Sequence, residues 1–108
     1  MVNVKIVVFV PLTYVDVVRE AIGKAGAGII GNYSYCSFSS KGIGRFKPNK
    51  MANPHIGKAD QLEKVEEERI EFVCSRDKAK SVIIAIKKVH PYEEVALDIY
   101  PLMEEGEL

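Results

Sequence analysis

The sequence predicts an α+β fold, in which a four-stranded antiparallel sheet carries two helices on one face. Two observations support this class. The chain twice shows a strand-like run followed by a helix-like apolar stripe, and each of these units is followed by another extended segment. A long connection rich in Gly, Pro and Asn separates the two halves. The predicted element order is therefore βαββαβ, with a long loop between the second and third strands.

The first unit starts with a strand at residues 2–11, where apolar residues alternate and β-branched side chains are frequent. Pro11 marks the end of this strand. Thr13 then offers a hydroxyl as the N-cap of a helix, and an apolar stripe with helical spacing predicts that helix over residues 14–25.

The second unit repeats this plan with a strand at residues 69–74, an N-cap at Asp77 and a helical stripe over 79–89. The remaining strands are expected at 32–40 and from residue 95 onward. Two βαβ units in this order form the ferredoxin-like sandwich, and we expect the first and third strands at the centre of its sheet.

Composition narrows the class of protein. The 108 residues predict one domain, and 15 basic residues balance 15 acidic ones. The zero net charge gives no general attraction to nucleic acid or to an anionic membrane. No apolar run approaches the roughly 20 residues that span a bilayer, and we identify no signal peptide. Two cysteines, Cys36 and Cys74, are too few for a disulfide framework. We expect a cytoplasmic protein without a cofactor.

The long connection, residues 41–61, carries basic residues and no acid before Asp60, whereas the segment that follows is strongly acidic. Two interpretations stay open. The segments neutralise each other within or between chains, or the loop binds a small anion. In the second case the glycines of "GIGRF" (42–46), expected to permit positive φ in a hairpin or bulge, form an anion nest beside Arg45 and Lys47. We expect this loop to be the least rigid part of the free chain, with Phe46 and Ile56 as its anchors if it is ordered.

The segment "HPYEEVALDIYPL", residues 90–102, joins the second helix to the last strand. Pro91 disfavours helical geometry at His90, so the helix should end there. Glu93 and Glu94 are adjacent and make a poor catalytic pair. A lone histidine is more often structural than a metal ligand. The alternative is a small metal-dependent hydrolase or metal-binding protein that uses His55, His90 and the nearby glutamates.

This segment resembles the HPYEEPAYDIYPL signature of the small domain inserted in YqfO-type proteins, the bacterial members of the Nif-three-like family. The segments "GNYSYCSFSSKGIGRFKP" and "ANPHIGKADQLEKVEEERIE" resemble two further motifs of that domain, in the same order. Val95, Leu97 and the pair Ala59–Asp60 depart from the family pattern, which suggests relaxed turn geometry. A shorter match, "HPYE", is similar to the trimeric CutA and PII-like proteins, whose fold is ferredoxin-like.

The resemblance implies a stand-alone version of the inserted domain over residues 1–108. The paired metal site of Nif-three-like proteins lies in flanking domains that this sequence lacks, so no metal site or hydrolase activity is transferred. The implied function is a non-enzymatic, oligomeric binding or regulatory module of PII/CutA type. The ligand-binding candidates are Asn32, Tyr33, Cys36, Arg45, Phe46, Lys47, His55, His90, Tyr92 and Glu93.

The expected partner is a second copy of the chain, with a trimer favoured over a dimer. Helices cover only one face of the predicted sheet, and the other face would carry Val7, Phe9 and Val73. We expect this surface to be too apolar for water and to be covered by another subunit. A small anion is the other expected partner.

Overall fold

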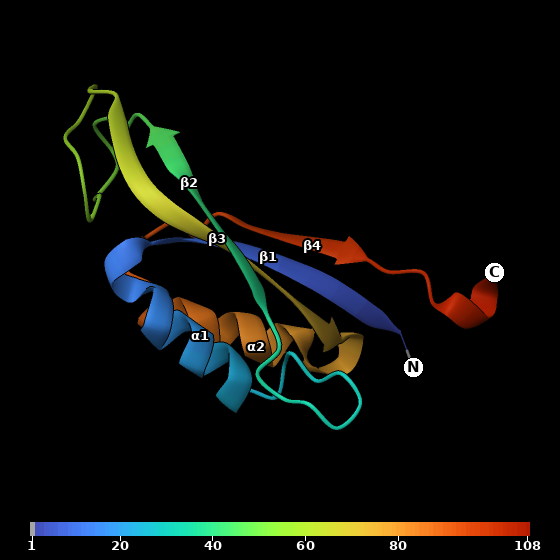
Figure 1. The fold of residues 1–108 in the computed structure, drawn as a ribbon. Coiled ribbons are helices and arrows are strands. Elements are labelled where there is room, and N and C mark those ends of the chain that lie inside the picture. The colour runs from blue at the N-terminus through green and yellow to red at the C-terminus, as the bar shows by residue number, and fades with distance from the viewer. Residues whose placement is uncertain (1) are drawn as a thin grey trace.

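The computed structural model describes residues 2–108 and has the predicted βαββαβ order (Figure 1). The elements are β1 (Asn3–Pro11), the 3-10 turn η1 (Leu12–Tyr14), α1 (Val15–Lys24), β2 (Phe38–Phe46), β3 (Glu63–Ser75), α2 (Arg76–Val89), β4 (Leu97–Pro101) and the 3-10 turn η2 (Glu105–Glu107). Within residues 2–108, no helix is both long enough and apolar enough to span a bilayer.

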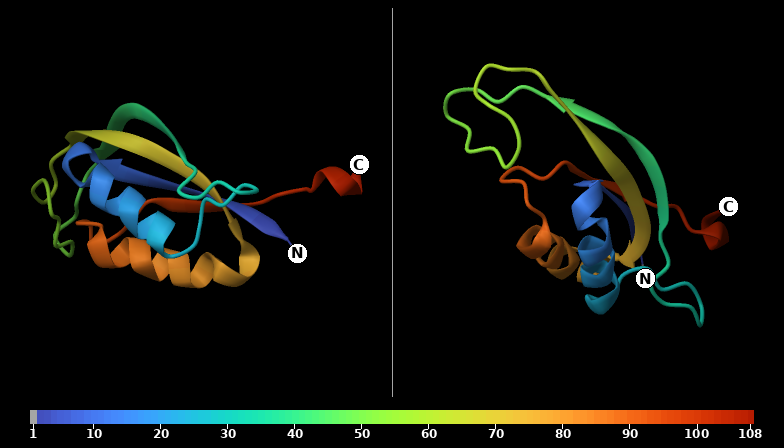
Figure 2. Two further views of the ribbon diagram at one scale, coloured as in Figure 1. Left: turned by 60° about the horizontal axis from the view of Figure 1, so that its bottom comes forward. Right: turned by 60° about the vertical axis from the view of Figure 1, so that its left-hand side comes forward.

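The four strands form one antiparallel sheet in the order β2-β3-β1-β4. The first and third strands are central, as predicted, and both helices lie on one face of the sheet (Figure 2). The stretch 43–46 of β2 pairs with 63–66 of β3 beyond the end of β1. These eight residues form a two-stranded arm, which carries the loop 47–62 at its tip (Figure 1).

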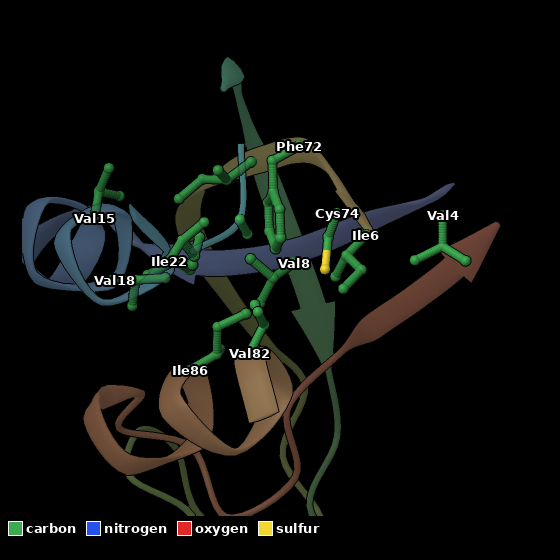
Figure 3. Packing of buried hydrophobic residues seen from close by; sticks show 13 residues of the cluster. Val4, Ile6, Val8, Val15, Val18, Ile22, Phe72, Cys74, Val82 and Ile86 are labelled. Atoms are coloured by element: carbon green, nitrogen blue, oxygen red, sulfur yellow. The ribbon is translucent and has the colours of Figure 1, made fainter. Parts of the chain in front are cut away.

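The core lies between the helices and the inner face of β1 and β3 (Figure 3). Alternate residues of each strand point into it, and both helices contribute the apolar stripes that the sequence predicted. Its buried members include Val4, Ile6, Val8, Val10, Val15, Val18, Ile22, Ile70, Phe72, Cys74, Val82 and Ile86. The predicted ferredoxin-like architecture is confirmed.

The predicted boundaries of the second and third strands are wrong. β2 covers residues 38–46 instead of 32–40, and β3 begins at Glu63 instead of Arg69. The segment 28–36 turns instead of extending, with a bridge between Ile30 and Tyr33. The "GIGRF" segment is therefore strand, not a hairpin, bulge or anion nest, because its backbone finds ladder partners along the acidic run of β3.

Both predicted N-caps are also wrong. The α1 helix begins after a 3-10 turn, with Tyr14 at the N-cap position in place of Thr13. The α2 helix follows β3 directly, so Ser75 takes the N-cap position and Asp77 lies in the first turn. A carboxylate there still suits the positive helix N-terminus. The predicted end of α2 is confirmed, since His90 has extended backbone angles.

The outer face of the sheet is less apolar than expected. Val7 is fully buried within the single chain, so the expectation that it needs a second subunit as cover is wrong. Lys5 on β1 and Glu71 on the paired strand β3 form an ion pair with an N–O distance of 3.3 Å. Phe9 and Val73 are half-buried. Cross-strand charged side chains therefore cover part of this face in the monomer.

Candidate functional site

His90 holds the join between α2 and β4 in place. Its Nε2 donates a hydrogen bond of 2.7 Å to the carbonyl of Phe9, and its Nδ1 accepts one of 3.2 Å from the N–H of Tyr92. Because a backbone N–H can only donate, these contacts select the neutral tautomer with the proton on Nε2. Burial lowers the pKa of His90, against opposing effects of the Phe9 carbonyl and Glu67. Both ring nitrogens are engaged, so His90 is a structural histidine in this arrangement.

Tyr92 lies at the centre of an aromatic cluster. Its ring is 4.9 Å from that of His90 and 6.3 Å from those of Phe46 and His55. Its hydroxyl donates a hydrogen bond of 2.9 Å to Glu67 Oε2. Burial raises the pKa of Tyr92, and the hydrogen bond and charge of Glu67 raise it further. The phenol therefore stays protonated and remains a hydrogen-bond donor.

Glu67 is the residue of this site that sequence reasoning missed. It lies within β3 and is only 8% exposed. Gly44 on the neighbouring strand makes room for it, since a Cβ added at Gly44 would collide with the Glu67 carboxylate. Tyr92 is 25 positions away in the sequence, and no local pattern connects the two residues. Only the pairing of β2 with β3 and the return of the chain after α2 bring them together.

A cavity of about 410 Å³ lies between the end of β2, the loop 47–62 and the segment 90–96. A hydrogen bond of 2.7 Å from the backbone N–H of Asn53 to Glu93 Oε1 ties this loop to the segment 90–96. Within the loop, the N–H of Asp60 donates to the carbonyl of Pro48 at 2.6 Å. Asp60 has a φ of 61°, a left-handed conformation that Asp tolerates.

The cavity brings together part of the predicted site. Predicted candidates that line it are Arg45, Phe46, Lys47, His55, Tyr92 and Glu93. Glu94 also lines the cavity, together with Gly44, Glu67 and the expected anchor Ile56. The wall is thus aromatic and apolar, with carboxylates and cations placed around it.

The candidates Asn32, Tyr33 and Cys36 lie elsewhere. They belong to the turn segment between α1 and β2, at the other end of the molecule from the loop 47–62 (Figure 1). The N–H of Cys36 donates to the carbonyl of Gly28 at 2.8 Å, which fixes the base of this segment. The structure therefore does not join Cys36 to His55 and His90.

We also searched the described residues for clusters of side chains that could ligate a metal ion. Among residues 2–108, no group of three or more His, Cys, Asp and Glu side chains could hold a metal ion. Cys74 is buried in the core, where burial raises the pKa of its thiol against the opposing charge of Lys78.

Within residues 2–108 of one chain, the acidic run of β3 forms no ion pair with the basic segment 41–58. Within residues 2–108, the ion pairs join Arg19 to Asp16 and Glu68, and Lys5 and Arg69 to Glu71. No cation of the segment 41–58 takes part in them. Arg45 and Lys47 therefore reach the cavity without a carboxylate partner within 4.0 Å in the described chain.

The sequence and the structure of this chain both resemble those of known proteins. No family model matches the chain. It is 58% identical over 103 residues to the protein named GTP cyclohydrolase 1 type 2 homolog of Halalkalibacterium halodurans, a match that covers 95% of this chain and 28% of that protein. A Bacillus cereus protein related to NIF3 has a crystal structure that matches with a TM-score of 0.82 at 50% identity, over 95% of this chain and 26% of that one.

This chain is homologous to one domain of the NIF3-related proteins. The resemblance to YqfO-type, Nif-three-like proteins is thereby confirmed. The CutA protein of Archaeoglobus fulgidus shares the fold, with a TM-score of 0.69 at 13% identity over 94% of this chain and 85% of that one. The chain spans 28% of the length of the H. halodurans protein. The activity of the longer proteins is therefore not assigned to this domain.

Proposed function

We propose that this chain is a non-enzymatic binding or regulatory module of PII/CutA type, whose cavity takes a small anionic ligand. The observation that carries the proposal is the cavity itself. Its volume of about 410 Å³ falls within the range of small-molecule sites, which is about 300–1,000 Å³. Three segments distant in the sequence form its wall, and hydrogen bonds from Tyr92 and Asn53 connect them.

The cations of the wall support an anionic ligand. Arg45 and Lys47 are exposed residues that line the cavity and form no ion pair within the described chain. Phe46 and Tyr92 supply an aromatic surface beside them. An aromatic anion would therefore bury its ring against these side chains while its charge meets the cations.

We expect benzoate to bind in the cavity and to shift the backbone NMR signals of residues 45–56 and 92–96. The double variant Arg45→Gln, Lys47→Gln should weaken binding roughly tenfold, because it removes both cations. The matched control is Lys50→Gln, Lys58→Gln, which removes two cations of the loop 47–62 that do not line the cavity. Shifts at other sites, or equal losses of affinity in both variants, would contradict the proposal.

We further expect amide exchange of the free protein to be fastest in residues 47–62 and to slow when benzoate binds.

We also propose that the module is a homo-oligomer, with a trimer favoured over a dimer. Phe38 is 68% exposed at the start of β2, Tyr100 is 45% exposed on β4, and both strands have a free edge. Light scattering at micromolar concentration should give a multiple of the 12.0 kDa chain mass. Phe38→Ser should weaken assembly, whereas Met51→Ser, which changes a 91% exposed loop residue, should not. A mass of one chain that does not rise with concentration would refute assembly.

A further inference from the structure

Glu67 is a largely buried residue, and one oxygen of its carboxylate has no hydrogen-bond partner within residues 2–108. Its Oε2 accepts the hydrogen bond from Tyr92, but no donor from residues 2–108 forms a hydrogen bond with its Oε1. The residue lines the cavity and also a smaller groove of about 280 Å³ on the neighbouring surface. The carboxylate is therefore in a position to meet a ligand.

The charge of Glu67 also has no partner in the described chain. No cation of residues 2–108 lies within 4.0 Å of its carboxylate. Arg69 is two positions along the same strand, yet its Nε is 3.3 Å from Glu71 Oε2. Tyr92 provides one hydrogen bond but no charge. A buried carboxylate without a cation is costly for the free chain, and a bound cation would offset that cost.

The facing strand leaves the space beside Glu67 open. Gly42 and Gly44 are two positions apart on β2, and both line the groove next to Glu67. Neither has a positive φ, so backbone conformation does not require glycine at these positions. A side chain at Gly44 would instead occupy the place of the carboxylate. Gly44 thus leaves room for the carboxylate beside the cavity.

We infer that the ligand of this cavity brings the missing positive charge, as an amidinium or guanidinium group that donates N–H hydrogen bonds to Glu67. This inference rests on the proposed function, because the anionic part of the same ligand would meet Arg45 and Lys47. The planar fork of such a cation matches a carboxylate, and an aromatic body between the two charges would lie against Phe46 and Tyr92. The chemical class is a zwitterionic aromatic compound.

The test compares 4-guanidinobenzoate, benzamidine and benzoate on the wild-type chain and on Glu67→Gln. The amide keeps an oxygen that can accept the Tyr92 hydrogen bond but removes the charge. We expect 4-guanidinobenzoate to bind the wild type at least roughly tenfold tighter than benzoate, and this ratio to disappear in Glu67→Gln while benzoate binding stays unchanged. The control is Glu66→Gln, which removes an exposed carboxylate next to Glu67 that does not line the cavity and should keep the ratio.

Stability of the free protein gives a second readout. Glu67→Gln should raise the melting temperature, because it removes a buried charge that has no cation partner within residues 2–108, whereas Glu66→Gln should not. If benzoate binds but 4-guanidinobenzoate and benzamidine gain nothing from Glu67, the inference fails and the proposed anion site stands. If none of the three compounds binds, both fail. A ratio that survives in Glu67→Gln would also overturn the inference.

Discussion

Replacing Gly44 with valine is expected to lower the free energy of unfolding by about 3 kcal/mol, because overpacking adds to the loss of a buried hydrogen bond. The same change at Gly42 is expected to be neutral or to stabilise the protein by up to about 1 kcal/mol, since valine suits a strand better than glycine. Both glycines lie on β2, two positions apart. A Cβ at Gly42 meets no atom within 4 Å, whereas a Cβ at Gly44 meets the Glu67 carboxylate.

This matched pair isolates the space around Glu67, because both glycines lie on β2 and neither has a positive φ. Urea denaturation of the two variants would measure the difference. The Gly44 variant should also lose benzoate and 4-guanidinobenzoate binding, because the displaced carboxylate can no longer hold Tyr92 against the cavity wall. Equal stabilities for the two variants would mean that Glu67 moves aside without cost and that the close packing at Gly44 has no role.

Local patterns in the sequence were sufficient for the fold but not for the arm. The apolar alternation of β1 and the stripes of both helices depend on neighbours within a few residues, and they predicted the core correctly. The two glycines of the stretch 42–46 predict a turn, and the many charged residues of 63–68 give no apolar alternation that would predict a strand. These two segments are strands only because each supplies the ladder partners of the other. Pairing between distant segments overrides local preference here.

The site shows the same division. Motif resemblance directed attention to Tyr92, His55 and the stretch 45–47, which the structure places around one cavity. Glu67 is one of three consecutive acidic residues in the run "EEER", and nothing in the local sequence distinguishes it from its neighbours. Its carboxylate is held by the hydroxyl of Tyr92 and occupies the space beside Gly44, and both residues belong to other segments. A residue defined by non-local packing of this kind needs a structure to be found.

Replacing His90 with phenylalanine is expected to destabilise the protein by about 2–4 kcal/mol at pH 7.5. The ring keeps its size, but the Phe9 carbonyl and the Tyr92 N–H lose their partners, and each unpaired buried group costs about 1–3 kcal/mol. The matched control is His55→Phe. His55 is exposed and forms none of the hydrogen bonds found within residues 2–108, so its replacement should change stability by less than about 1 kcal/mol.

The pH dependence of the same pair tests the tautomer of His90. Burial lowers the pKa of His90 in the folded protein, so below the unfolded value of about 6.5 the unfolded chain binds a proton that the folded chain does not. The stability that neutral His90 contributes is therefore complete above about pH 6.5 and is lost as the pH falls toward the folded pKa, by at most about 1.4 kcal/mol per pH unit. Denaturation of wild type and His90→Phe from pH 7.5 to pH 5 should show the difference between them shrinking, since the carboxylates titrate in both proteins. A difference that widens on acidification would mean that folded His90 prefers the charged form, which its contact with the Tyr92 N–H forbids.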